Sequence, residues 1–112
     1  MALTIAMVAK NPFALYRAKE QFVAEHMRDV VAVDGMQEAC QIRLYDGTVI
    51  KLLSESDWRR GICCRADFDQ ILQVGPEPLG IDFRLELNEC LRNSCVPEEY
   101  QWQTWNGGGG DG

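Results

Sequence analysis

A short turn between two apolar segments is the feature that most limits how this chain can fold. Asp46-Gly47 separates residues 41–45 from residues 48–53, and Asp-Gly readily supplies the positive φ angles of a type I′ turn. The sequence therefore predicts a β-hairpin over residues 41–53. Its second arm, TVIKLL, is apolar on both faces, so we expect this arm to lie inside a sheet and not at its edge.

One long helix is predicted before the hairpin. Asn11 is a suitable N-cap and Pro12 a suitable first helical residue, so the helix should span about residues 12–28. Residues 3–9, just before it, are apolar on both faces, as in a strand that is covered on both sides. Residues 30–33, after it, are β-branched and predict a second strand, parallel to the first across a right-handed crossover.

Two more strands are predicted after the hairpin. Residues 68–74 are largely apolar and end at a Gly-Pro turn. Residues 81–87 alternate strictly between apolar and polar side chains, which is typical of a half-buried strand near the edge of a sheet. Between these strands and the hairpin, residues 57–69 are expected to be irregular or to form a single helical turn.

Together these elements predict an α/β (or α+β) fold, with one main helix packed on a mixed sheet of five or six strands. Residues 1–98 are expected to form a single domain, and residues 99–112 an aromatic and glycine-rich C-terminal tail. Trp102 and Trp105 in this tail either pack back on the core or stay exposed as contacts for a partner.

Charge and hydropathy limit the classes of partner. The 112 residues include 11 Lys and Arg against 17 Asp and Glu, a formal net charge of −6. This disfavours direct nucleic-acid binding, which depends on neutralising phosphates, and it suits a basic protein as partner. No apolar run reaches the roughly 20 residues of a membrane span, and the first residues do not resemble a secretory signal. We therefore expect a cytoplasmic protein without membrane contact.

Cysteine and histidine give no site that is recognisable from sequence. The spacing of the five cysteines does not fit a zinc site, and a secreted disulfide framework would use an even number. We expect free thiols, no metal and no cofactor. Catalysis by Cys63 or Cys64 is an alternative, but it needs a base beside the thiol, and His26 is the only histidine.

The candidate site residues lie in one charged loop and in the tail. For a protein partner they are Trp58, Arg59, Arg60, Trp102 and Trp105. For an anion they are Arg59, Arg60 and Arg65, because guanidinium groups suit phosphate and carboxylate. Salt bridges with the neighbouring carboxylates across a solvated loop are the alternative for these arginines, and Trp58 can equally cap the core.

The order of segments is also similar to a known arrangement. Strand LTIAMVA, helix PFALYRAKEQF, hairpin RLYDGTVIKLLS, Arg60-Gly61 and strand FDQILQV follow one another within residues 3–77. This order resembles part of the ATPase domain of the large terminase subunits that package tailed-phage genomes. The phosphate-binding G-x-x-x-x-G-K-[ST] motif is absent, and Glu77 stands displaced among prolines where the family has an acidic pair. The resemblance therefore implies a relative that kept the scaffold without the ATPase.

These observations favour a small acidic, non-enzymatic protein that acts by binding another protein, such as an accessory or inhibitory protein of a phage or mobile element. A host nucleic-acid-binding protein is one candidate partner, because carboxylates can take the place of phosphates. A second copy of the chain is another, because one long helix leaves part of the sheet uncovered. The alternative function is a nucleotide- or anion-binding module that uses Arg59, Arg60 and Arg65.

Overall fold

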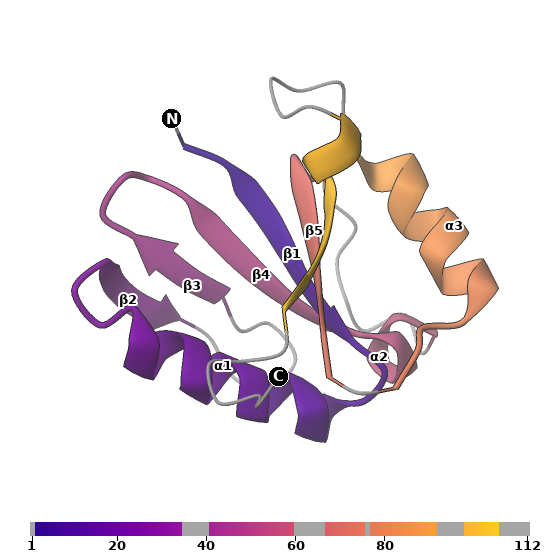
Figure 1. The fold of residues 1–112 in the computed structure, drawn as a ribbon, viewed down its shortest axis with the longest axis horizontal. Coiled ribbons are helices and arrows are strands. Elements are labelled where there is room, and N and C mark those ends of the chain that lie inside the picture. Colours follow the sequence, from indigo (N-terminus) through magenta and orange to yellow (C-terminus); the bar gives the residue numbers. More distant parts are fainter. Residues whose placement is uncertain (1, 35–40, 60–66, 76, 92–97, 106–112) are drawn as a thin grey trace.

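The computed structural model describes residues 2–34, 41–59, 67–75, 77–91 and 98–105, which form one mixed sheet with helices on both faces (Figure 1). The predicted α/β class and mixed sheet are confirmed. The sheet has six strands in the order β2-β3-β4-β1-β5-β6. The elements are β1 (Thr4–Ala9), α1 (Pro12–Glu25), β2 (Val30–Asp34), β3 (Gln41–Leu44), β4 (Val49–Ser54), α2 (Glu55–Arg59), β5 (Gln70–Val74), α3 (Ile81–Cys90), the 3-10 helix η1 (Glu98–Tyr100) and β6 (Trp102–Trp105).

The strand directions bring three strand ends to the same edge of the sheet. β1 pairs in parallel with β4 on one side and with β5 on the other, and β6 pairs in parallel with β5. β2, β3 and β4 form an antiparallel meander. β2 therefore runs in the same direction as β1, as predicted, although β3 and β4 lie between them. The carboxyl ends of β1, β4 and β5 meet beside α2.

The hairpin is confirmed, but the predicted type I′ turn is wrong. The connection has three residues: Leu44 N–H donates to Thr48 O over 2.9 Å, and Gly47 N–H donates to Leu44 O over 3.1 Å. Gly47 has a φ of 94°, whereas Asp46 has a negative φ. The Asp46 carboxylate instead accepts a hydrogen bond of 2.8 Å from Thr48 N–H. A type I turn followed by a left-handed glycine needs only one positive φ, which suits an L residue at position 46.

Helix α1 begins as predicted and ends earlier. The Asn11 side chain accepts a hydrogen bond of 3.0 Å from Ala14 N–H, and Pro12 opens the helix. The helix ends at Glu25 and not near residue 28, because His26 O accepts from both Asp29 N–H and Val30 N–H, a turn that leads directly into β2. The His26 ring stacks on Phe22 with a centroid distance of 4.2 Å.

The predicted strand over residues 81–87 is wrong, because this segment forms helix α3. Phe83, Leu87 and Cys90 face the core, whereas Ile81 is 77% and Leu85 58% exposed. Phe83 and Leu87 share a face under both a two-residue and a 3.6-residue period. The choice between the periods falls to the intervening Arg84-Leu85-Glu86, which are good helix formers.

Two core layers sandwich the sheet, and β1 contributes to both. Ala6 and Val8 pack in the layer under α2 and α3, and Met7 and Ala9 pack in the layer under α1. This confirms the prediction that residues 3–9 form a strand covered on both sides. Full burial of one large apolar side chain contributes about 1.5–3 kcal/mol to the stability of the fold, so the alternate residues of β1 stabilise the packing of both helical layers on the sheet.

Strand β6 comes from the segment that was predicted to be a tail. Trp102 packs against the α3 layer and Trp105 against the α1 layer, as expected for residues of opposite parity in a strand. Within residues 99–112, Trp102–Trp105 therefore belong to the sheet and residues 99–100 to η1, and residues 106–112 lie outside the described residues. The sheet reaches six strands with β6 in place of the strand predicted over residues 81–87.

Among the described residues, no helix is both long and apolar enough to cross a membrane.

Candidate functional site

A group of polar side chains lies where the three parallel strands end. Lys10 directly follows β1, Glu55 directly follows β4, and Glu77 lies beyond the end of β5. Ligands of open α/β sheets bind outside the carboxyl ends of parallel strands, where successive connections leave toward opposite faces. Here β1 leads into α1 on one face and β4 leads into α2 on the other. The topology therefore marks this edge as a candidate binding site.

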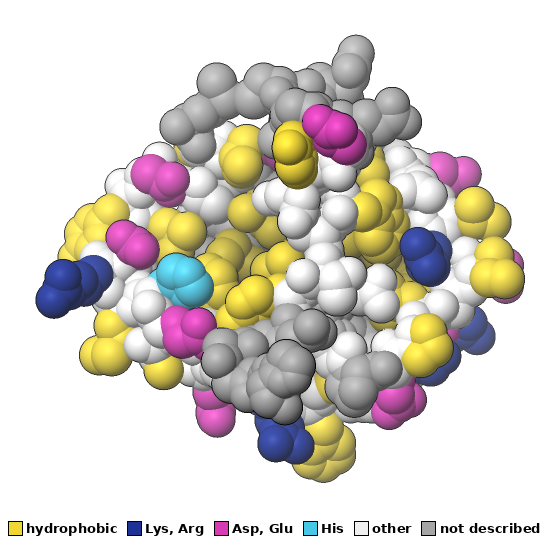
Figure 2. All heavy atoms as spheres, in the orientation of Figure 1, with side chains coloured by type: hydrophobic (Ala, Val, Ile, Leu, Met, Phe, Trp, Pro, Cys, Tyr) yellow, Lys and Arg dark blue, Asp and Glu magenta, His cyan; other side chains and the backbone are white. Residues whose placement is uncertain are grey.

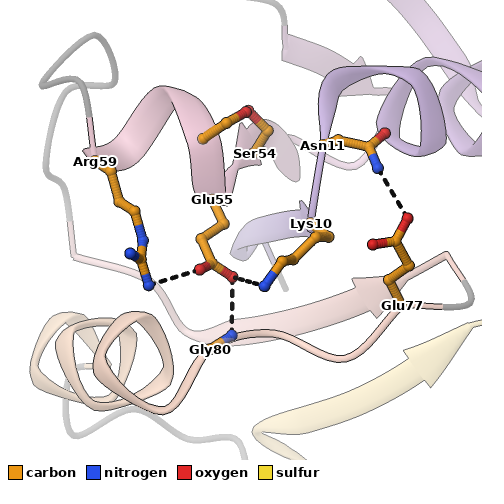
Figure 3. A network of polar contacts seen from close by, with 8 residues as sticks. Lys10, Asn11, Ser54, Glu55, Arg59, Glu77 and Gly80 are labelled. Carbon is orange, nitrogen blue, oxygen red and sulfur yellow. Dashed lines mark hydrogen bonds and ion pairs between the residues drawn. The ribbon is translucent and has the colours of Figure 1, made fainter.

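Glu55 is the centre of this group, as Figure 3 shows. The residue is only 3% exposed, and its carboxylate accepts a hydrogen bond of 2.8 Å from Gly80 N–H. Arg59, one helical turn further along α2, approaches the other carboxylate oxygen to 2.9 Å, and Lys10 lies 3.6 Å from the oxygen that Gly80 uses. One buried carboxylate thus connects β1, α2 and the segment that leads into α3.

These contacts also set the ionisation of Glu55. Burial alone raises the pKa of its carboxyl, but the Gly80 N–H and the cations of Lys10 and Arg59 together outweigh burial, so the pKa lies below its ordinary value. The carboxylate is therefore charged at neutral pH. It balances one of the two cations beside it and leaves the other uncompensated within the group.

A small hollow opens beside the carboxylate. Its volume is about 260 Å³, and it is lined by Lys10, Glu55, Ser56 and Arg59. The Lys10 and Arg59 side chains are 40% and 59% exposed, so their nitrogens can meet a molecule from solvent. Asn11, next to Lys10, donates a hydrogen bond of 3.3 Å to Glu77, which places a second carboxylate near this edge.

The predicted anion site is placed only in part. Arg59 lies in the hollow, and Arg60 and Arg65 lie outside the described residues. The salt-bridge alternative applies to Arg59, although its partner is Glu55 and not a carboxylate of the loop. Sequence reasoning missed both Lys10 and Glu55. Their signal was available, because each is the first charged residue after a predicted buried strand.

Trp58 was predicted either to anchor a partner or to cap the core, and the structure shows the cap. The residue is 8% exposed. Its ring packs edge-on against Phe83 at 5.6 Å, and its Nε1–H donates a hydrogen bond of 2.9 Å to Glu86. A side chain that is enclosed in this way cannot also present its ring to a partner, so Trp58 leaves the set of candidate contacts.

Trp102 and Trp105 are half-buried and held by neighbours. Trp102 Nε1–H donates to Asn88 over 2.6 Å, and the Arg84 guanidinium lies over the Trp102 ring at 5.4 Å. Trp105 meets Phe22 edge-on at 5.7 Å. Of the two alternatives for these tryptophans, the structure shows packing on the core. They support the surface beside α3 and the end of α1.

The outer face of α3 carries apolar side chains that stay largely exposed to solvent. At 100° per residue, Ile81, Leu85 and Glu89 fall within one sector of about 80°, with Asp82 at its border. Ile81 and Leu85 stand one helical turn apart and are both exposed. Over α3, at the right of Figure 2, hydrophobic side chains reach the surface among charged ones. We call Ile81, Asp82, Leu85 and Glu89 the outer face of α3.

Two carboxylates outside the strand-end group, one before β5 and one in α3, have structural roles. Asp69 is buried and accepts a hydrogen bond of 2.9 Å from Thr4 N–H, which ties the start of β5 to β1. Glu86 accepts a hydrogen bond from the Trp58 indole N–H. Within the described ranges, no three His, Cys, Asp or Glu side chains are placed to hold a metal ion. Cys63 and Cys64 lie outside the described residues, so the alternative of a cysteine nucleophile stays a prediction.

No protein-family model matches this chain, and comparisons with curated proteins and with solved structures also give no match.

Proposed function

We propose that this chain is a non-enzymatic protein that binds a basic protein partner through the outer face of α3. The observation that carries the proposal is the exposure of Ile81 and Leu85 on a helix whose inner face already fills its share of the core with Phe83 and Leu87. Ile81 and Leu85 keep most of their surface in water in the folded chain, so burial at these two outer positions adds little to the stability of the fold. Binding a partner would gain from them, since removing apolar surface from water is favourable.

Charge supports a basic partner. Asp82 and Glu89 border the apolar pair, and the one cation of α3, Arg84, lies over Trp102. A complementary surface would be an apolar groove with Lys or Arg at its rim, because rim charges of opposite sign accelerate encounter and exclude wrong partners. A second copy of this chain would bring carboxylates against carboxylates on this face. The charge pattern therefore favours another protein over a homodimer.

The wider role stays part of the same proposal. A protein of net charge −6 that covers a basic surface can compete with nucleic acid for it, as an accessory or inhibitory protein of a phage or mobile element in the cytoplasm would. The resemblance to the terminase ATPase domain is compatible with such an origin. Direct binding to nucleic acid is not part of the proposal, since the outer face of α3 offers carboxylates where phosphates need cations.

Site-specific photo-crosslinking in cells of the source organism tests this proposal. A photoreactive residue at Ile81 or Leu85 should join the chain to a protein with a basic surface. When the irradiation is repeated in a lysate of these cells, the yield of this crosslink should fall as salt is added, because rim charges are screened. The matched control carries the same residue at Val31, another exposed aliphatic side chain, on the edge strand β2. Equal recovery of the partner from positions 31 and 81, or a crosslink only between two copies of the chain, would count against the proposal.

A further inference from the structure

We infer that the hollow between Lys10 and Arg59 binds a small oxyanion, such as inorganic phosphate or the phosphate group of a metabolite. This goes beyond the proposed protein binding, because the hollow lies at the strand ends and not on the outer face of α3. It also differs from the arginine cluster predicted in the loop, since one of the two cations is Lys10, from the end of β1.

The charges that line the hollow favour an anion. Two cations and one carboxylate face it, which leaves one positive charge, and the Ser56 hydroxyl, 3.3 Å from that of Ser54, also lines it. The carboxylate holds the cations in place: Arg59 is fixed through one terminal nitrogen at 2.9 Å, and Lys10 more loosely at 3.6 Å. The guanidinium has five N–H donors and the ammonium three, so both can serve Glu55 and an incoming oxyanion together.

The elements around the hollow also favour an anion. Helix α1, with 14 residues, begins at Pro12, two residues after Lys10, and the N-terminal end of a helix carries a partial positive charge that favours anions. The hollow also lies at the carboxyl edge of the parallel strands, where open α/β sheets hold their ligands.

The size of the hollow restricts the ligand. At about 260 Å³ it is below the roughly 300–1,000 Å³ of pockets that enclose drug-sized molecules. It can accommodate a phosphate group, whereas most of a nucleotide would remain outside. The ligand class is therefore a free oxyanion or a small phosphate monoester.

Amide chemical shifts measured during titration with inorganic phosphate, at constant ionic strength, test the inference. We expect saturable shifts centred on Lys10, Ser56 and Arg59. Lys10→Gln or Arg59→Gln should weaken binding about tenfold, since each removes a charged hydrogen-bond partner of the anion. Arg17→Gln is the matched control, because Arg17 is an exposed cation on α1 that does not line the hollow, and it should leave the affinity unchanged within about twofold.

Two further arms sharpen the test. Glu77→Gln removes the second carboxylate near this edge and should tighten phosphate binding about twofold, as expected for a weak screened charge. Titration with glycerol phosphate distinguishes the sources: tighter binding than inorganic phosphate would point to a metabolite, and equal binding to the free ion. Shifts that do not saturate, or an Arg17→Gln variant that loses as much affinity as Lys10→Gln, would overturn the inference. The variants' amide spectra show whether each remains folded, and either cation variant alone suffices.

Discussion

Among the polar side chains at the carboxyl ends of the strands, Glu55 should be the one whose replacement destabilises the fold most. In Glu55→Ala, Gly80 N–H loses its 2.8 Å acceptor, and Arg59 and Lys10 lose their shared anion. A donor left without a partner costs about 1–3 kcal/mol, and a hydrogen bond to a charged group contributes about 1.5–3 kcal/mol. The ion pairs themselves add little, because both cations are partly exposed and such pairs contribute about 0–1 kcal/mol.

We therefore expect Glu55→Ala to lower the free energy of unfolding by about 2–4 kcal/mol and Glu55→Gln, which keeps an acceptor for Gly80, by about 1–2 kcal/mol. Urea denaturation measures both through the midpoint, with the slope unchanged. Glu77→Gln is the matched control: its carboxylate is exposed and accepts one hydrogen bond of 3.3 Å, so the loss should stay within about 0.5 kcal/mol. A Glu55→Ala variant that is no less stable than Glu77→Gln would refute this account of the strand-end group.

Three further outcomes follow from the same structure. Because the pKa of folded Glu55 lies below its ordinary value of 4.5, the Glu55 carboxylate stabilises the fold fully above that pH and loses this effect as pH falls through the folded pKa. In denaturation series, the difference in stability between wild type and Glu55→Gln should therefore be constant above about pH 5 and narrow below it. A difference that widens in acid would contradict the lowered pKa of Glu55. Gly75→Ala should cost about 1–3 kcal/mol in urea denaturation, because Gly75 has a φ of 88° and the added Cβ would lie 3.0 Å from that of Ala14. By the same measurement, Phe83→Ala should lower the free energy of unfolding by about 3–5 kcal/mol and Leu85→Ala by less than about 0.5 kcal/mol. Similar losses from the two variants would indicate a strand over residues 81–87, in which both side chains would face the core.

The positions of the hairpin and of the start of α1 could be predicted from the sequence, because a local residue pattern is sufficient to determine each of them. Asp46-Gly47 between apolar arms placed the hairpin, and Asn11-Pro12 placed the start of α1. In both places a backbone requirement and a side-chain pattern agree. The turn type was missed because Asp-Gly serves a three-residue connection as well as a two-residue one, and only the hydrogen bond between Leu44 and Thr48 separates the two.

The errors arose where local patterns compete or where contacts are distant in sequence. Alternation over residues 81–87 suited a strand, but Phe83 and Leu87 share a face in a helix as well, and the intervening Arg84-Leu85-Glu86 favour the helix. Trp102 and Trp105 looked like a tail because β6 pairs with β5, some 30 residues earlier, and no local signal announces such a pairing. The strand-end site was missed for the same reason: Lys10, Glu55 and Gly80 are brought together only by the parallel pairing of β1 with β4 and β5.

Binding of a basic partner by the outer face of α3 is tested most directly by affinity measurements. The protein that the crosslink identifies is titrated with two matched double variants of this chain, one on α3 and one on β2. Full burial of a large aliphatic side chain contributes about 1.5–3 kcal/mol, and Ile81 and Leu85 are 77% and 58% exposed, so burying both on binding would contribute about 2–4 kcal/mol together. Ile81→Ser with Leu85→Ser should then weaken binding about 30- to 1,000-fold, while Val31→Ser with Val33→Ser on β2 should change it less than about threefold. Equal losses from the two double variants, or no loss from the α3 pair, would contradict the claim.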